Sequence, residues 1–388
     1  MSAIYLDNAA TTAADPRVIA AMLECLGADG DFANPAAVAH EPGRRAQRRI
    51  EQARAEVAGL VGADLAQIVW TSGATEADNL ALLGAARFYQ SRGRHLVTSR
   101  TEHPAVLEPC RQLEREGFEV TYLKPAADGI VEPRQVEAAL RHDTILVSLM
   151  HVNNEIGVVQ DVGSVGRLCR ERGILFHVDA AQSAGKLPIH VERDCIDLLA
   201  LTAHKLHGPK GVGALCVRRE PRLGLVPLLR GGGQERGLRP GTLATHQVVG
   251  MGVACRIAAE VREEENARIT SLRERLWQGL SGLPGVTLNG HPTQRAPGIL
   301  SVTIDGVEGE SLLYALPGLA VASGSACATT SAEPSYVLRA LGRSDRLAQS
   351  SLRLSLGRYT TGTDVELAVR SIRRAVERLR AVAPGSAG

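Results

Sequence analysis

Hydrophobic positions along the chain form short apolar runs that alternate with longer segments of helical periodicity. The apolar runs, which predict strands, cover 68–71, 95–98, 120–123, 144–150, 174–178 and 197–202. Helices are expected between them, over 76–87, 105–116, 132–140 and 162–171. This alternation predicts an α/β fold with a largely parallel sheet covered by helices on both faces. One more strand, at 211–217, is expected to form the return edge of the sheet.

The pattern differs at both ends of the chain. A short strand is expected over 5–12, then helices over 16–26 and 44–60 around a loop rich in Gly and Pro. From 257 a long charged helix to 280 precedes short strands at 286–288, 300–304 and 352–356, with helices at 308–316 and 365–382. We therefore predict a large domain over 16–256 and a smaller α+β domain over 257–388, on which residues 1–15 pack.

Composition and charge exclude several classes of function. The chain has 44% hydrophobic and 22% charged residues, and its net charge of +2 argues against a dedicated nucleic-acid binder. The sequence has no apolar run of membrane-spanning length and no secretory signal at its start, so we expect a cytoplasmic protein without a membrane partner. The seven cysteines are scattered without a CxxC pair, which argues against a disulfide framework or a structural zinc site.

Polar residues at two predicted strand ends are the first candidates for chemistry. Asp179 follows one strand, and His204 and Lys205 follow another. Ligands of open α/β sheets bind at the carboxyl ends of strands. A lysine there can form a Schiff base with a carbonyl cofactor, and an aspartate can hold a protonated ring nitrogen. A solvated surface lysine and a helix-capping aspartate are the alternatives.

Three further strand ends carry polar groups. The turn after 68–71 can bind a phosphate through helix N–H groups and the hydroxyls of Ser72 and Thr75, or Thr75 is an ordinary N-cap. His103 precedes a proline, which favours extended geometry that aims the ring into the cleft, unless it caps the next helix at the surface. Asn154 can bond a phenolic oxygen or a carboxylate, or belong to an Asn-Asn turn.

Three later features are open to two interpretations each. The loop 231–242 is rich in glycine and arginine and can bend around an anion, or it is a flexible surface loop. Cys327 lies among Gly, Ser and Ala, which predicts an exposed thiol on a mobile loop. This thiol either reaches a reactive centre or is a loop cysteine without a function. Arg353 interrupts an apolar strand, where it can bind a substrate carboxylate or form a structural salt bridge.

Together these motifs resemble the cysteine desulfurases, pyridoxal-phosphate enzymes of the class V aminotransferase superfamily, and most closely the housekeeping type of iron–sulfur cluster assembly. The resemblance covers roughly residues 4 to 380. Its elements are YLDNAATT, TSGATEADNLAL, TEHPAVL, MHVNNEIGVVQD, FHVDAAQSAGKLPI, HKLHGPKGVGAL, GGGQERGLRPGT, SGSAC, EPSYVLRALG and SLRLSLGRYT. It implies the fold type I architecture, with a mainly parallel seven-stranded sheet in the large domain and a smaller α+β C-terminal domain.

The resemblance also assigns roles to individual residues. Lys205 would bind pyridoxal 5'-phosphate covalently, His103 would stack on its ring, and Cys327 would attack the substrate sulfur. Asp179 would hold the ring nitrogen and Gln182 the phenolic oxygen. The phosphate would be held by Ala74, Thr75, Thr202, His204 and, from the other subunit of a homodimer, Thr242. Asn154 and Arg353 would bind the substrate carboxylate.

The implied reaction converts L-cysteine to L-alanine and leaves a persulfide on Cys327, which passes to an iron–sulfur scaffold protein and other sulfur acceptors. No resident metal is expected, although Cys327 could transiently ligate a cluster with a scaffold partner. Alternatives are a selenocysteine lyase or cysteine sulfinate desulfinase of the same superfamily, and a non-catalytic sulfur-transfer scaffold. A metal hydrolase built on His177, Asp179, His204 and His207 is a further alternative, against which Pro209 argues.

Overall fold

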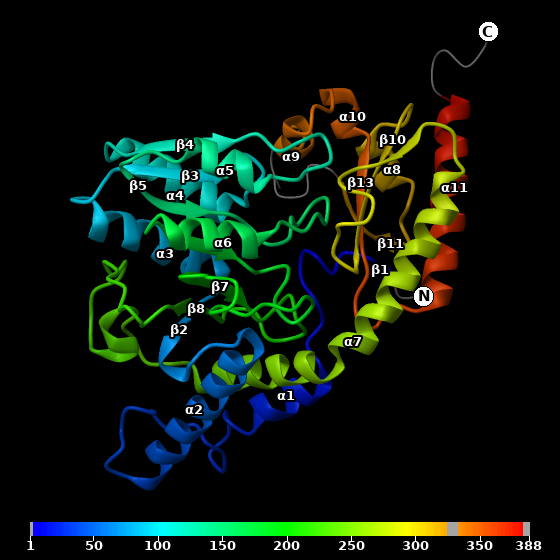
Figure 1. The fold of residues 1–388 in the computed structure, drawn as a ribbon. Helices are drawn as coiled ribbons and strands as arrows, with labels where there is room; N and C mark the ends of the chain where they lie inside the picture. The colour runs from blue at the N-terminus through cyan, green and yellow to red at the C-terminus, as the bar shows by residue number, and fades with distance from the viewer. Residues whose placement is uncertain (1–2, 324–332, 383–388) are drawn as a thin grey trace.

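The large sheet has seven strands, as the computed structural model shows over residues 3–323 and 333–382 (Figure 1). Their order is β2-β8-β7-β6-β5-β3-β4. The bounds are β2 Ile68–Thr71, β3 His95–Ser99, β4 Glu119–Leu123, β5 Thr144–Ser148, β6 Leu175–Asp179, β7 Leu198–Thr202 and β8 Gly213–Val217. Five neighbouring strands, β7-β6-β5-β3-β4, are parallel to one another. This confirms the predicted mainly parallel seven-stranded sheet.

The position of β8 differs from the prediction. This strand is antiparallel to both of its neighbours and lies between β2 and β7, so it is an interior strand. The edges of the sheet are β2 and β4. All five residues of β8 are buried, which explains its uniformly apolar sequence.

Helices cover both faces of the sheet because alternate strand residues point to opposite sides. In β7, Leu199 and Leu201 belong to one hydrophobic core, and Leu198 and Ala200 to the other. The first core includes residues of α2 (Glu41–Val61) and α6 (Val162–Glu171), and the second those of α3 (Ala74–Tyr89) and α4 (Pro104–Arg115). The remaining elements of this part are α1 (Pro16–Leu23), the 3-10 turns Leu65–Gln67 and Gln234–Gly237, and α5 (Pro133–Ala139).

The C-terminal part contains a separate antiparallel sheet of order β12-β13-β10-β9. Its strands are β9 Val286–Leu288, β10 Ile299–Ile304, β12 Ala322–Ser323 and β13 Ser351–Ser355, and its helices are α8 Gly309–Tyr314, α9 Tyr336–Ala340, α10 Asp345–Gln349 and α11 Gly362–Val382. The N-terminal strand β1 (Ile4–Tyr5) pairs in parallel with β11 (Leu319–Ala320). Residues near the start of the chain therefore contact the C-terminal part.

Helix α7 (Thr245–Ser281) is longer than the predicted helix and begins twelve residues earlier, at Thr245 rather than 257. It therefore crosses the predicted domain boundary at 256/257. The first turns contain Gly250 and Gly252, whose low helix propensity hides the helix in the sequence. A Cβ on Gly252 would lie 2.5 Å from the Cα of Ala53, so the glycine allows α7 to pack closely on α2. Within the described residues, no helix is long and apolar enough to cross a membrane.

Candidate active site

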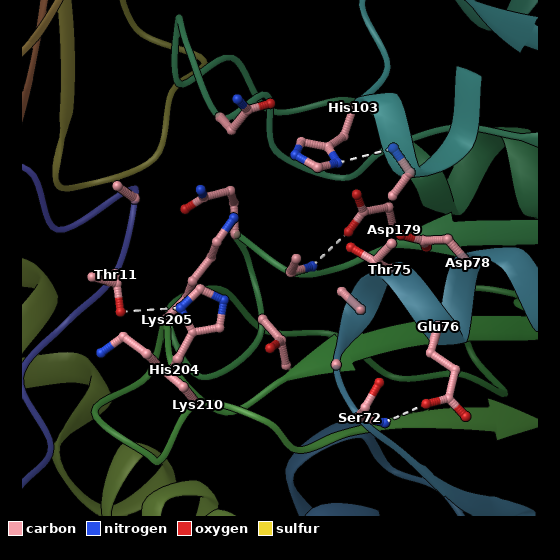
Figure 2. A pocket seen from close by; sticks show the side chains of 18 of the residues that line it. Thr11, Ser72, Thr75, Glu76, Asp78, His103, Asp179, His204, Lys205 and Lys210 are labelled. Atoms are coloured by element: carbon pink, nitrogen blue, oxygen red, sulfur yellow. Dashed lines mark hydrogen bonds between the residues drawn. The ribbon is translucent and has the colours of Figure 1, made fainter. Parts of the chain in front are cut away.

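A cavity of about 530 Å³ opens at the carboxyl ends of β6 and β7 (Figure 2). Asp179 is the last residue of β6 and Thr202 the last of β7, and both line the cavity. The structure brings nine of the predicted site residues together in this wall: Ala74, Thr75, His103, Asn154, Asp179, Gln182, Thr202, His204 and Lys205. The chain thus places acidic, basic and amide groups around one solvent-filled space.

The N-terminus of α3 forms one end of the cavity. Gly73 is its N-cap and no side chain caps the helix, so the alternative in which Thr75 serves as the cap is wrong. Uncapped N–H groups at a helix start attract anions. Glu76 accepts a hydrogen bond from the Ser72 amide at 2.8 Å (Figure 2). It also forms an ion pair with Arg239 at 3.0 Å, and the two contacts fix the turn.

His103 lines the cavity and caps α4 at the same time, so both interpretations of this residue hold. Its Nδ1 accepts a hydrogen bond from the Ala105 amide at 3.1 Å, which leaves the proton on Nε2. Burial lowers the pKa of His103, and the nearby Asp179 carboxylate opposes that shift. The neutral ring is therefore held in a fixed orientation beside Asp179, whose Oδ1 accepts from the Ala181 amide at 2.8 Å.

Cationic side chains gather on the opposite wall. Lys205 and Lys210 line the cavity beside His204, and Nδ1 of His204 lies 3.1 Å from Oγ1 of Thr11 (Figure 2). Burial lowers the pKa of His204 to about 4, and Lys205, Lys210 and Lys186 contribute in the same direction. His204 is therefore neutral at pH 7, and the positive charge of this wall comes from the lysines.

The amide of Gln182 has a defined orientation. Its Nε2 donates to the carbonyl oxygen of Ala9 at 2.7 Å, and its Oε1 accepts from Nζ of Lys186 at 3.5 Å. Burial and, less strongly, the neighbouring Lys205 lower the pKa of Lys186 to about 8. The second amide proton of Gln182 stays available to an acceptor in the cavity.

Asn154 and Arg353 are joined through the backbone. The turn after β5 is made by Asn153, whose Oδ1 accepts from the amides of Glu155 and Ile156. The side chain of Asn154 is therefore free of the turn, and its Oδ1 is buried without a hydrogen-bond partner in the described chain. Arg353 donates to the carbonyl oxygen of Asn154 at 3.0 Å and forms a salt bridge with Asp7.

Two predicted site residues remain: Thr242, which does not line the cavity, and Cys327, which is not among the described residues. Thr242 is exposed at the end of the 231–242 loop. Glu235 anchors that loop in the protein, because its carboxylate is buried against Arg54 at 2.9 Å and accepts from the Trp70 amide. The loop is thus held at its centre. Cys327 falls in 324–332, outside the described residues.

Sequence reasoning missed two buried acids below the cavity. Asp78 lines its floor close to Asp179 (Figure 2), and its Oδ1 lies 3.3 Å from Nε2 of His177. Burial raises the pKa of Asp78 and of Glu102 well above the usual carboxyl range, and the charge of Asp179 adds to both shifts. A polar residue on the apolar face of a helix is a usable signal for Asp78, because it shares that face with buried Ala81 and Leu82.

The metal-hydrolase alternative has no site in the described part of the chain. No group of three or more His, Cys, Asp or Glu side chains there could hold a metal ion. His207 instead bonds the carbonyl oxygen of Ala13 at 2.9 Å and positions the N-terminal segment.

Known proteins share both the sequence and the fold. The class V aminotransferase family model matches residues 4–367. The cysteine desulfurase IscS of Enterobacter sp. (strain 638) is 56% identical and that of Proteus mirabilis (strain HI4320) 57%, each over 98% of this chain and 94% of the relative. A solved NifS-like protein has a TM-score of 0.89 at 35% identity, with 98% of this chain and 100% of that protein covered.

A solved structure described as SspA in complex with cysteine has a TM-score of 0.82 at 39% identity, covering 92% of this chain and 99% of that one. These similarities confirm the predicted family and fold over almost the whole length. The chain therefore belongs to the class V aminotransferase family, in its branch of housekeeping cysteine desulfurases.

Proposed function

We propose that the protein removes sulfur from L-cysteine, yielding L-alanine and a persulfide on Cys327. In this reaction the C–S bond of the substrate breaks, and a sulfur–sulfur bond forms with the Cys327 thiolate. The observation that carries the proposal is the convergence of Lys205, Asp179 and His103 on one cavity at the strand ends. Relatives named cysteine desulfurase, 56–57% identical over 98% of the chain, support it.

The donor set of the cavity fits pyridoxal 5'-phosphate. The uncapped start of α3, with Ala74 and Thr75, suits its phosphate, as do Thr202 and His204 from the neighbouring wall. Asp179 suits a protonated ring nitrogen, the oriented amide of Gln182 suits a phenolic oxygen, and Lys205 supplies the amine for a covalent link. When bound, the cofactor supplies an electron sink for carbon–sulfur cleavage.

The chain's own residues would orient the substrate and move its protons. Asn154, through the N–H groups of its side-chain amide, and Arg353, through its buried guanidinium, would donate hydrogen bonds to the α-carboxylate. The Lys205 amine accepts and returns protons at the substrate carbons. His103 is fixed by its hydrogen bond to the Ala105 amide, so it would cover one side of the cofactor and exclude water there.

We further infer a homodimer in which Thr242 of one subunit completes the phosphate site of the other. Exposed apolar side chains in the segment 16–40 support this inference: Ile19, Leu23, Leu26, Phe32 and Val38 are each about half exposed. Light scattering of the holoprotein is expected to give twice the chain mass. A monomer with cofactor bound would contradict the dimer.

The persulfide needs an acceptor, and we propose an iron–sulfur scaffold protein together with other sulfur-accepting proteins. The support is the similarity to housekeeping cysteine desulfurases. The cytoplasmic location stays a prediction from the sequence.

The deciding experiment measures alanine and sulfide formed from L-cysteine by the purified holoprotein with a reductant. Equal amounts of the two products are expected, and both should disappear in Lys205→Ala and Cys327→Ser. Matched controls are Lys124→Ala, at an exposed lysine, and Cys195→Ser, at a partly exposed cysteine far from the cavity. Full activity of Cys327→Ser would reject this residue as the nucleophile and favour the selenocysteine or sulfinate alternatives.

A further inference from the structure

Arg353 lies in the middle of β13, with its side chain only 5% exposed. This strand pairs with β12 on one side and β10 on the other, so Arg353 occupies an interior position of the C-terminal sheet. A buried guanidinium requires hydrogen-bonding and charged partners. The identity of those partners determines what the group can bind.

The hydrogen bonds of Arg353 leave one edge of the guanidinium incompletely used. Nη1 donates to the carbonyl oxygen of Asn154 at 3.0 Å, and Nη2 donates to Oδ1 of Asp7 at 2.8 Å. Nε is buried and has no hydrogen-bond partner in the described chain. Asp7 therefore holds the guanidinium through a single bond, whereas a carboxylate can bind two parallel N–H groups at once.

Asp7 is placed so that its carboxylate can leave without disturbing the chain around it. Its backbone forms a bridge with Ser355, and its carbonyl oxygen accepts from the amide of Ala10 at 3.1 Å and from the hydroxyl of Tyr5 at 3.2 Å. The side chain is 24% exposed, in contrast to its partner. A rotation of the side chain would therefore release Nη2 into water while the backbone stays fixed.

We propose that Asp7 is an exchangeable internal carboxylate that occupies Arg353 until the α-carboxylate of the substrate replaces it. The incoming carboxylate takes Nη2 from Asp7 and also engages the unpartnered Nε, so the two-bond contact replaces a one-bond contact. Asp7 thereby neutralises the buried guanidinium in the free protein and sets the affinity for carboxylate-bearing ligands. The inference deepens the proposed function, on which it rests.

The alternative is a purely structural pair, in which Asp7 fixes Arg353 in its binding orientation. The two readings predict opposite effects of removing the charge. Loss of a competitor strengthens ligand binding, whereas loss of an orienting partner weakens it.

The test is calorimetric titration of the holoprotein with L-alanine, which carries the carboxylate, and with ethylamine, which lacks it. Asp7→Asn is expected to lower the Kd of L-alanine roughly twofold to fivefold, the range of a partly exposed ion pair, and to leave ethylamine binding unchanged. Asp7→Glu retains the charge and is expected to stay near the wild type.

A matched control is Asp345→Asn, which removes an exposed pair with Arg339 far from the cavity and should change neither Kd. Weaker or unchanged L-alanine binding in a folded Asp7→Asn protein would overturn the proposal. If Asp7→Asn fails to fold, Asp7→Ser is titrated under the same criteria. Failure of the wild type to form alanine from cysteine would instead reject the proposed function, so the two failures are distinguishable.

Discussion

At the scale of single residues, three acids lie in or near the floor of the site, and burial distinguishes two of them from the third. Asp78 and Glu102 have raised pKa values because both are fully buried and face the charge of Asp179. Burial thus favours the protonated form of both acids, which reduces like-charge repulsion beside Asp179. Asp179 remains the acid suited to hold a cationic ring.

We predict that Asp78→Asn and Asp179→Asn have unequal effects. Asn resembles the protonated carboxyl that burial favours at position 78, so cofactor affinity should change little. At position 179 it removes the ion pair that we propose with the ring nitrogen, worth ~1–4 kcal/mol, so the Kd of the cofactor should rise about tenfold or more. Fluorescence titration of the apoproteins with pyridoxal phosphate measures both values, and equal losses would contradict the assignment of charges.

Glu155 gives a second prediction, on pH. Burial raises its pKa from 4.5 to about 7, against the opposing effects of Ser335 and Arg353. Because the folded-state pKa is the higher one, the contribution of Glu155 to stability is complete below about pH 4.5 and is lost as the pH rises through 7.

Glu155→Gln should therefore stabilise the protein at pH 8, by up to about 3 kcal/mol, and have little effect at pH 5. Thermal unfolding at the two pH values measures the difference. The control is Glu310→Gln, whose side chain is exposed. Equal unfolding of wild type and Glu155→Gln at pH 8 would show that the fold does not raise the pKa of Glu155.

The sequence predicts the position of residues at strand ends, but it does not predict contacts between residues that are far apart in the chain. Lys205 and Asp179 follow apolar runs, so their position at the sheet edge could be predicted. The pairing of Arg353 with Asp7 joins positions 346 residues apart, and no local pattern reports such a contact. Asp78 was missed because a single polar residue in a helix usually faces solvent.

At the scale of elements, the first turn of α3 depends on the close approach of β8. A Cβ on Gly213 would lie 2.4 Å from the carbonyl oxygen of Leu201 and 2.6 Å from the Cα of Gly73. The glycine at 213 thus allows β8 to pack against the turn for which we propose phosphate binding.

We predict that Gly213→Ala displaces this turn and destabilises the protein by about 1–3 kcal/mol, with weaker cofactor binding. Gly59→Ala is the control, because Gly59 lies within α2 with nothing within 4 Å of an added Cβ. That change should stabilise the protein by ~0.5–1 kcal/mol. Thermal unfolding compares the two, and an unaffected Gly213→Ala protein would contradict the packing argument.

The strand arrangement shows why sequence alone misplaced β8. An apolar run of five residues fits an edge or an interior strand, and its direction depends on the connection that follows β7. That connection, 203–212, is short enough for an antiparallel return. The insertion of β8 between β7 and β2 depends on pairing with a strand more than 140 residues earlier in the chain.

At the scale of the whole molecule, Arg358 joins segments from three parts of the chain. It contacts Asp15, the N-cap of α1, at 2.9 Å, and Glu265 of α7 at 3.0 Å, with 14% of its side chain exposed. The hydrogen bond of Arg17 and, less strongly, that of Arg358 hold the pKa of Asp15 well below its usual value.

We predict that Arg358→Met lowers the free energy of unfolding by about 1.5–3 kcal/mol, because the charge-assisted hydrogen bonds to Asp15 and Glu265 are lost. The control is Arg275→Met, which breaks the exposed pair with Glu366 between α7 and α11 and should cost less than about 0.5 kcal/mol. Urea unfolding at pH 7.5 measures both. Equal losses would mean that burial adds nothing to the Arg358 contacts.

The 37 residues of α7 form one uninterrupted helix about 55 Å long, which packs on α1 and α2 at one end and on α11 at the other (Figure 1). Its first half contributes Val248 and Met251 to the core that α2 and α6 share with the large sheet, and its second half contributes Leu272 and Leu276 to a separate core in the C-terminal part. Unfolding of one core should therefore destabilise the other, because neither end of the helix can unwind without exposing apolar surface. Calorimetry of the intact chain should therefore give one endotherm, and a fragment that ends before residue 257 should not fold as an independent unit.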